Sequence, residues 1–249
     1  MNENAIIAEN VSKHFFILRH RETAFRVIKA LLHKEPLMKK LRVLHNISVT
    51  IKQGERVAVV GNNGAGKTTL LRLMAGIYKP TTGLIRTGSE PKVLLNFWTG
   101  FNNDLSVIDN VYLRGAIVGG ERKALTHDMK VILEMAGLAT FMYSPLKRLS
   151  MGQIQRLSLS VFLNTPGDFL ILDECLAFVD KGFIIKSDAA IREKITGGKT
   201  IIMASHDGEF LARHCPRAIW LDEGRIRMDG DCRRVICEYE RSVAGQAAK

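Results

Sequence analysis

Short hydrophobic runs, separated by turn-forming residues and by longer amphipathic stretches, dominate the sequence. Continuous apolar or alternating runs are typical of strands, whereas apolar positions spaced three and four residues apart are typical of helices. The sequence predicts strands at residues 5–16, 41–51, 56–60, 84–86, 93–97, 169–173 and 200–204, and a hairpin at 218–226. Because such strands alternate with helical stretches, we expect an α/β fold.

Helical patterns follow residue 68, cover most of 102–150, and resume after Ser150. Breaks at Gly115, Gly119-Gly120 and Pro145 divide the middle stretch. We interpret residues from about 102 to 165 as a helical subdomain inserted into the α/β core. The whole pattern gives a single domain at 5–240 and a short tail at 241–249, frayed from Ala244.

Residues 17–42 contain eight Lys or Arg and only two Glu. Four apolar residues, Phe25, Ile28, Leu31 and Leu32, fall on one face of a helix, with basic residues between them. An amphipathic basic helix of this kind suits an anionic membrane surface or the polar rim of a membrane partner. A solvated helix packed on its own domain explains the pattern equally well.

The segment Gly61-Asn62-Asn63-Gly64-Ala65-Gly66-Lys67-Thr68 fits the phosphate-loop pattern G-x-x-x-x-G-K-[ST] and lies between a predicted buried strand and a predicted helix. This arrangement points backbone N–H groups and the positive end of the helix dipole at one spot, which makes an anion site. We expect Lys67 to reach the β- and γ-phosphates of a nucleoside triphosphate and Thr68 to offer its hydroxyl to Mg²⁺. The strand and helix disfavour the alternative of a glycine-rich turn with a chance lysine.

Two carboxylates, Asp173 and Glu174, come directly after the apolar run that starts at residue 169. The carboxyl ends of parallel strands open onto the ligand crevice in α/β sheets, so both acids are expected to face the bound phosphates. Asp173 would hold Mg²⁺, directly or through water. Glu174 would orient and deprotonate an attacking water. The alternative is a pair of surface acids after a core strand.

Three more residues are candidates from their positions. His206 follows the predicted strand at 200–204 and would meet the γ-phosphate. Ser150 is a predicted N-cap. Phe15, close to the end of the first strand, could stack on a purine ring. Each has a simpler alternative: His206 as a structural histidine, Ser150 as a helix cap with no other role, and Phe15 as a core phenylalanine.

Composition narrows the class of protein. A chain of 249 residues with 46% hydrophobic residues can bury a sizeable core. It has no apolar run of roughly 18 residues to span a bilayer, and its first residues lack a signal-peptide profile, so we expect a cytoplasmic location. Cys175, Cys215, Cys232 and Cys237 have no metal-site spacing and are expected to be free thiols. The net charge of +11 fits nucleic acid, anionic lipid or a soluble basic surface without choosing among them.

Three motifs now stand in a fixed order: the phosphate loop, Leu149-Ser150-Met151-Gly152-Gln153, and Asp173-Glu174. This order resembles the ATP-binding cassette of ABC transporters, over residues 5–240. The resemblance implies a P-loop NTPase fold with a mixed core sheet, a small antiparallel β subdomain and an inserted helical subdomain. It also implies a head-to-tail homodimer, in which each ATP lies between the phosphate loop of one copy and the signature segment 150–153 of the other.

The resemblance also assigns roles. Glu174 corresponds to the catalytic base, Asp180 to the aspartate that crosses the dimer interface, and His206 to the switch histidine, so that these three and Lys67 form the catalytic set. Thr68 and Asp173 correspond to the Mg²⁺ residues. The residues that contact ATP are Phe15 at the base, the loop residues Gly61, Asn62, Asn63, Gly64, Ala65, Gly66, Lys67, Thr68 and Thr69, and the partner's copy of Ser150, Gly152 and Gln153.

The sequence departs from the family pattern in two places. The second glycine of the signature is Met151, although the serine, glycine and glutamine keep their spacing, so the backbone contact to the γ-phosphate is expected to survive. The loop that normally carries a glutamine toward Mg²⁺ and the membrane domain has none in residues 95–102. Asn96 is the available substitute, and we do not assign it that role.

Within the family, the basic insert and residues 100–115, 177–180 and 218–226 resemble cassettes that export O-antigen, capsule or teichoic acid. The resemblance implies an ATPase at the cytoplasmic face of the inner membrane that powers export of a lipid-linked polysaccharide, works with a separate transmembrane permease, and binds no nucleic acid. The alternatives are an import or drug-efflux cassette and a soluble ABC ATPase acting on ribosomes or nucleic acid. Relatives of the last kind usually carry two cassettes or long coiled-coil inserts, which this chain lacks.

Overall fold

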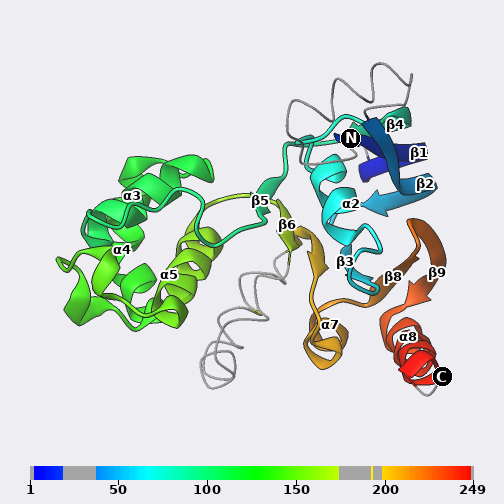
Figure 1. Cartoon of the computed structure of the whole chain (residues 1–249). Coiled ribbons are helices and arrows are strands. Elements are labelled where there is room, and N and C mark those ends of the chain that lie inside the picture. The colour runs from blue at the N-terminus through cyan, green and yellow to red at the C-terminus, as the bar shows by residue number, and fades with distance from the viewer. Residues whose placement is uncertain (1–2, 19–37, 174–191, 193–197, 248–249) are drawn as a thin grey trace, which may run out of the picture.

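Two β-sheets organise the chain in the computed structural model, which describes residues 3–18, 38–173, 192 and 198–247 (Figure 1). The larger sheet has the strand order β5-β6-β7-β3-β8-β9. Its strands are β5 (Lys92–Leu94), β6 (Phe169–Asp173), β7 (Thr200–Ala204), β3 (Arg56–Val60), β8 (Arg217–Asp222) and β9 (Arg225–Asp231). All neighbours are parallel except the hairpin β8–β9, so the predicted mixed core sheet is confirmed.

Both faces of the larger sheet are buried. Val57, Val59 and Ile202 point to one face, which α2 (Lys67–Met74) covers. Alternate residues such as Ala58 and Met203 point to the other face, which α7 (Gly208–His214) and α8 (Cys232–Ala247) cover. Burial on both faces explains why the central strands are continuous apolar runs in the sequence.

The smaller sheet is antiparallel, with the order β2-β1-β4, and its strands are β1 (Asn4–Leu18), β2 (Met38–Lys52) and β4 (Thr82–Thr87). It confirms the predicted antiparallel β subdomain. β1 and β2 extend further than predicted, with Phe16 opposite Lys40 and Ile17 opposite Lys39. The helical assignment is therefore wrong for residues 17–18 and 38–40, because cross-strand pairing takes these ends of the insert; residues 19–37 lie outside the described residues.

A helical lobe fills the range in which the inserted subdomain was predicted and projects to one side of the two sheets in Figure 1, with Phe162 and Leu163 packed in the core of the larger sheet. It consists of α3 (Val107–Ile117), α4 (Arg122–Ala136) and α5 (Met151–Asn164), with short 3₁₀ turns at Ala139–Phe141 and Leu146–Arg148. Val111, Ile132 and Leu157 pack together in a core of its own. The lobe therefore keeps its shape largely through its own contacts.

Two predictions about strand and helix ends are wrong. β5 stops at Leu94 instead of residue 97, because the following residues are held in a loop by α3, as described below. The range predicted as a frayed tail continues the helix α8 as far as Ala247. Cys215, Cys232 and Cys237 are free thiols as predicted, and Cys175 lies outside the described residues. Within the described ranges, none of the helices is long and apolar enough to cross a bilayer.

Candidate functional site

The phosphate loop has the strand-turn-helix context that the sequence predicted. β3 ends at Val60, and α2 begins at Lys67, with Gly66 as its N-cap in the left-handed region (φ 104°). The free N–H groups of the first turn of α2 therefore point toward the loop, and the helix dipole adds positive potential there. This geometry suits a phosphate group.

Two glycines are needed because the loop is pressed between strands. A Cβ on Gly61 would lie 2.2 Å from the carbonyl oxygen of Leu221, and a Cβ on Gly66 would lie 2.8 Å from Cδ2 of Leu44. The outer side of the loop is different, since a Cβ on Gly64 would meet nothing within 4 Å. The loop is thus fixed from behind by β8 and β2 and open where a ligand would approach.

Lys67 is buried and folds over the loop. Its Nζ donates to the carbonyl oxygens of Gly61 at 2.7 Å and Asn62 at 3.3 Å, and the N–H of Ala65 also donates to Asn62 O, at 3.1 Å. The ammonium group is therefore placed at the mouth of the loop with two backbone carbonyls to orient it. A cation in this position stabilises bound phosphate oxygens.

The turn between β8 and β9 supports the loop from outside. The N–H of Gly224 donates to Ala65 O at 3.1 Å, and Gly224 O accepts from the N–H of His45 at 2.8 Å. A Cβ on Gly224 (φ 74°) would lie 2.2 Å from Val43 O. The hairpin around Glu223-Gly224 was predicted, but its contact with the phosphate loop has no signal in the local sequence.

Asp173 and His206 lie at the same edge of the larger sheet as the phosphate loop. Asp173, the last residue of β6, is level with Ala204 of β7, which is level with Val59 of β3, two residues before Gly61. Asp173 is buried, whereas His206, two residues beyond β7, is exposed. The carboxylate of Asp173 and the hydroxyl of Thr68 supply the hard oxygen ligands that Mg²⁺ prefers, so the residues present fit that ion.

The signature segment lies in the helical lobe, at the start of α5, away from the loop that joins β3 to α2 (Figure 1). Ser150 is the N-cap, as predicted. Its Oγ accepts from the N–H of Gln153 at 3.3 Å, and Oε1 of Gln153 accepts from the N–H of Ser150 at 2.8 Å. Met151 is 55% exposed, and a Cβ on Gly152 would meet nothing within 4 Å. The segment presents an open surface.

Phe15, the predicted base-stacking residue, has aromatic and cationic neighbours within the chain. It packs edge-on against Tyr78 at 5.5 Å, beyond the end of α2, and Nζ of Lys13 lies 5.0 Å from its ring centroid. Tyr78 in turn accepts a hydrogen bond from Arg72 at 2.9 Å. The structural role of Phe15 is therefore visible, and its contact with an adenine base stays a prediction.

The loop after β5 is held by two buried polar residues of α3. The side-chain amide of Asn110 donates to carbonyls of Asn102, Leu105 and Ser106 and accepts from the N–H of Asn102. Arg114 donates to the carbonyls of Thr99 and Asn96. Oδ1 of Asn96 accepts from the N–H of Trp98 at 2.8 Å, so this side chain stabilises its own loop. Sequence reasoning did not find the roles of Asn110 and Arg114.

Glu174 and Asp180 lie outside the described residues. Their predicted roles as catalytic base and interface aspartate stay predictions. Among the remaining predicted residues, the structure brings together the loop 61–69, Asp173 and His206 on one sheet edge, and it leaves Ser150, Gly152 and Gln153 on a separate lobe.

Comparison with known proteins agrees with this geometry. Residues 44–177 match the family model described as ABC transporter. The chain is 35% identical over 225 residues to the O-antigen export system ATP-binding protein RfbB of Klebsiella pneumoniae, covering 90% of this chain and 88% of that protein. It is 31% identical over 234 residues to the Teichoic acids export ATP-binding protein TagH of Staphylococcus saprophyticus, covering 94% and 87%.

Solved structures show the same fold. The dimeric post-hydrolysis structure of the ATP-binding cassette MJ0796, bound to ADP and Pi, superposes with a TM-score of 0.70 at 20% identity, covering 91% of this chain and 98% of that one. The family match spans more than half of the chain, and the two export proteins are covered over most of their length. The chain therefore belongs to the ABC transporter family, as one of its ATP-hydrolysing cassettes.

Proposed function

We propose that this chain is the ATPase subunit of an exporter that carries a lipid-linked bacterial surface polysaccharide, of the O-antigen, capsule or teichoic acid type, across the inner membrane. The observation that carries the proposal is the similarity to O-antigen and teichoic acid export proteins over nearly the whole chain. The cassette geometry supplies the motor, and the subunit would work at the cytoplasmic face of the membrane.

Within the site, the loop 61–68 holds the phosphates of ATP. Lys67 compensates the charge of the β- and γ-phosphates, and the loop amides hold their oxygens. Thr68 and Asp173 hold Mg²⁺, which when bound offsets phosphate charge. Glu174 takes the proton of the attacking water, and His206, at the edge next to Asp173, faces the γ-phosphate end.

The active unit is a head-to-tail homodimer. The separation of the two half-sites supports this arrangement, because the loop opens on the sheet edge while the signature segment opens on the helical lobe. Each loop then needs Ser150, Gly152 and Gln153 of another copy to enclose the γ-phosphate. The partner's backbone amides and serine hydroxyl supply further donors there.

A mixing experiment tests the dimer. Lys67→Ala destroys one half-site and Ser150→Arg the other, so each variant alone should hydrolyse almost no ATP. In a mixture, a heterodimer pairs the intact loop of one variant with the intact signature of the other, and hydrolysis should rise above the sum of the separate rates. A mixture no more active than its components would contradict the head-to-tail arrangement.

The permease docks in the groove between the helical lobe and the larger sheet. This groove has a volume of about 770 Å³, and its lining includes Arg72, Asn96, Arg114 and Ile117. Ile77 in the groove wall, Ile117 and nearby Trp98 are exposed apolar side chains, which suit a protein partner. Ile117→Asp should lower ATPase stimulation by the permease and leave the rate of the isolated subunit unchanged. The matched control is Val131→Asp, an equally exposed position on α4.

The arm formed by Lys13–Leu18 of β1 and Met38–Leu44 of β2 contacts anionic lipid. Phe16 and Met38 are exposed, and Lys40 and Arg42 share their face of the arm, with Lys40 directly opposite Phe16. Exposed apolar and basic side chains together suit an anionic bilayer surface. Lys40→Glu with Arg42→Glu should reduce co-sedimentation with phosphatidylglycerol vesicles; unchanged binding would remove the arm from the proposal.

In cells, a strain with Lys67→Ala should lack the surface glycan and accumulate its lipid-linked precursor inside. Export needs the motor, whereas synthesis of the glycan on its carrier does not. The readout is glycan in surface and membrane fractions. Normal surface glycan in that strain, with the variant protein at wild-type abundance, would overturn the export function while leaving the ATPase assignment intact.

A further inference from the structure

We propose that Tyr239, on the C-terminal helix α8, is a positioning residue for the phosphate loop and acts through the side chain of Asn62. By holding Asn62, it keeps the loop in the shape that receives nucleotide phosphates. The inference rests on the assignment of residues 61–68 as the phosphate site under the proposed function.

One hydrogen bond makes the connection across most of the chain. The hydroxyl of Tyr239 donates to Oδ1 of Asn62 at 3.2 Å. Asn62 is the second residue of the loop, and its carbonyl oxygen accepts from the N–H of Ala65 and from Nζ of Lys67. Fixing the side chain of Asn62 therefore also fixes the carbonyl that orients the turn and the catalytic lysine.

Apolar packing alone does not explain why residue 239 of α8 is a tyrosine. Cys232, Val235 and Ile236 form the buried side of the helix, and Tyr239 continues this side at the next turn. Its ring packs edge-on against Trp220 of β8 at 5.8 Å. A leucine or phenylalanine would fill this space equally well, but only a hydroxyl at the ring tip reaches Asn62.

The phenol is suited to act as a donor. Burial, together with the nearby carboxylate of Glu240, raises the pKa of Tyr239 above its usual value. The neutral O–H form is therefore the form present at neutral pH. A part-buried hydroxyl that points at a side-chain amide also avoids much of the cost of an unsatisfied polar group.

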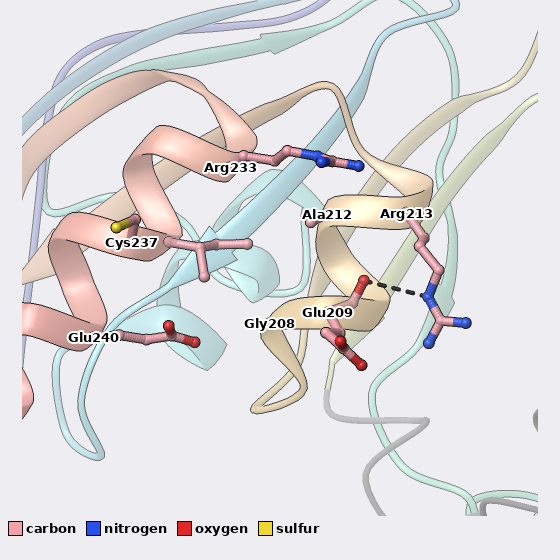
Figure 2. A pocket seen from close by; sticks show the side chains of 8 residues that line it. Gly208, Glu209, Ala212, Arg213, Arg233, Cys237 and Glu240 are labelled. Carbon is pink, nitrogen blue, oxygen red and sulfur yellow. Dashed lines mark hydrogen bonds between the residues drawn. The ribbon is translucent and has the colours of Figure 1, made fainter.

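A groove of about 470 Å³ lies between α7 and α8, lined by Glu209, Arg213, Arg233 and Glu240 over Ala212 and Ile236 (Figure 2). Ile236 and Glu240 line this groove, whereas Tyr239 turns toward Trp220 and Asn62, so its hydroxyl links α8 to the phosphate loop.

The test compares ATP affinity in two single variants and their combination. Tyr239→Phe keeps the ring and removes the hydroxyl; Asn62→Ala breaks the same bond from the loop side and leaves α8 untouched. Each should raise the Kd for ATP between about twofold and tenfold, the effect of one hydrogen bond. In the double variant, the second change should add nothing, because the bond is already lost.

A spectroscopic signature separates positioning from structural support. The chain has two tryptophans, so Trp98→Phe leaves Trp220, whose ring lies against Tyr239, as the reporter. In this background ATP should change the emission of Trp220, and Tyr239→Phe should remove most of that change without lowering the melting temperature by more than a few degrees. Tyr143→Phe, at a 78% exposed tyrosine of the helical lobe, is the matched control.

The inference would be overturned if Tyr239→Phe bound ATP with wild-type affinity. It would also be overturned if Tyr239→Phe lowered the ATP affinity of Asn62→Ala by as much as it lowers that of the wild type. Should Tyr239→Phe fail to fold, Asn62→Ala decides alone, since wild-type affinity in that variant also overturns it. Lys67→Ala distinguishes failure of this inference from failure of the proposed function. Normal ATP binding by that variant would refute the assignment of residues 61–68 as the phosphate site.

Discussion

The phosphate loop and the signature segment are both glycine-containing turns at the start of a helix, yet they are stabilised in opposite ways. The loop is enclosed by distant parts of the chain: Gly61 against Leu221, Gly66 against Leu44, and Ala65 hydrogen-bonded to Gly224. The signature is complete within four residues, since Ser150 and Gln153 cap each other. The phosphate loop is thus shaped by tertiary contacts within the subunit, whereas the signature segment is a locally capped turn on its surface.

This difference should separate substitutions that affect folding of the subunit from substitutions that affect its assembly. Changes behind the phosphate loop alter the subunit itself, because the loop is shaped by tertiary contacts. Changes at the signature should leave the subunit folded and alter only the surface that the proposed partner copy would meet. Four variants test the distinction by hydrolysis or ATP binding, and three of them also by a measurement of stability.

Lys67→Ala is expected to have the largest effect. Loss of the buried ammonium should lower ATP hydrolysis at least about 100-fold, because the charge that stabilises the transferring phosphoryl group is gone. Steady-state phosphate release measures the rate. Lys130→Ala, at an exposed lysine of α4, should hydrolyse ATP at the wild-type rate. Substantial hydrolysis by Lys67→Ala would mean that the loop is not the active half-site.

Asn110→Ala should destabilise the helical lobe by about 2 to 3 kcal/mol, since it leaves several buried backbone groups without partners. Urea unfolding measures the free energy of unfolding. ATP affinity should stay within about twofold of wild type, because the phosphate loop belongs to the larger sheet and not to the helical lobe. The exposed Asn103→Ala is the control. A large loss of ATP affinity in Asn110→Ala would show that the lobe and the loop are coupled.

Gly152→Ala should move stability and activity in opposite directions. There is open space for its Cβ, and alanine favours a helix over glycine, so the free energy of unfolding should rise by up to about 1 kcal/mol. Hydrolysis should fall about tenfold, because the new methyl group displaces the partner's ATP. Gly230→Ala, also with open space at the Cβ, controls for glycine replacement. Equal or faster hydrolysis would remove this surface from the site.

Met151→Gly restores the second glycine of the usual signature and should have the smallest effect. Met151 is exposed, and its neighbours Ser150 and Gly152 keep their positions, so hydrolysis should change by less than about twofold. A loss of stability of a few tenths of a kcal/mol is expected from glycine in the first helical turn. A large gain in hydrolysis would instead show that Met151 limits the enzyme.

Local chemistry explains which features the sequence could predict. The phosphate loop, the Ser150 cap and the Glu223-Gly224 turn each depend on residues within about eight positions, so their patterns are visible in the chain. The buried central strands were predictable because both of their faces are covered. The positions of Asp173 and His206 followed from the rule that ligands meet the carboxyl ends of parallel strands.

Long-range contacts explain what was missed. Residues 95–97 are apolar enough for a strand, but Asn110 and Arg114 hold the chain in a loop. The ends of the basic insert have helical spacing, but pairing between Phe16 and Lys40 makes them strand. The bond from Tyr239 to Asn62 joins residues 177 positions apart, and no local pattern indicates it. The helix α8 differs from these cases, because Val235, Ile236 and Tyr239 have the three- and four-residue spacing of a buried helix face, which is visible in the sequence.

Gly224 has a practical consequence for anyone who modifies this chain. A two-residue turn between antiparallel strands is ordinarily a good place for an inserted tag, reporter or new terminus. Here the turn reaches inward: Gly224 bonds Ala65 in the phosphate loop and His45 in β2, and its Cα lies too close to Val43 O for any side chain. An insertion at 223–224 would part the smaller sheet from the phosphate loop, so fusion partners belong elsewhere, although this is the hairpin that sequence alone recommends.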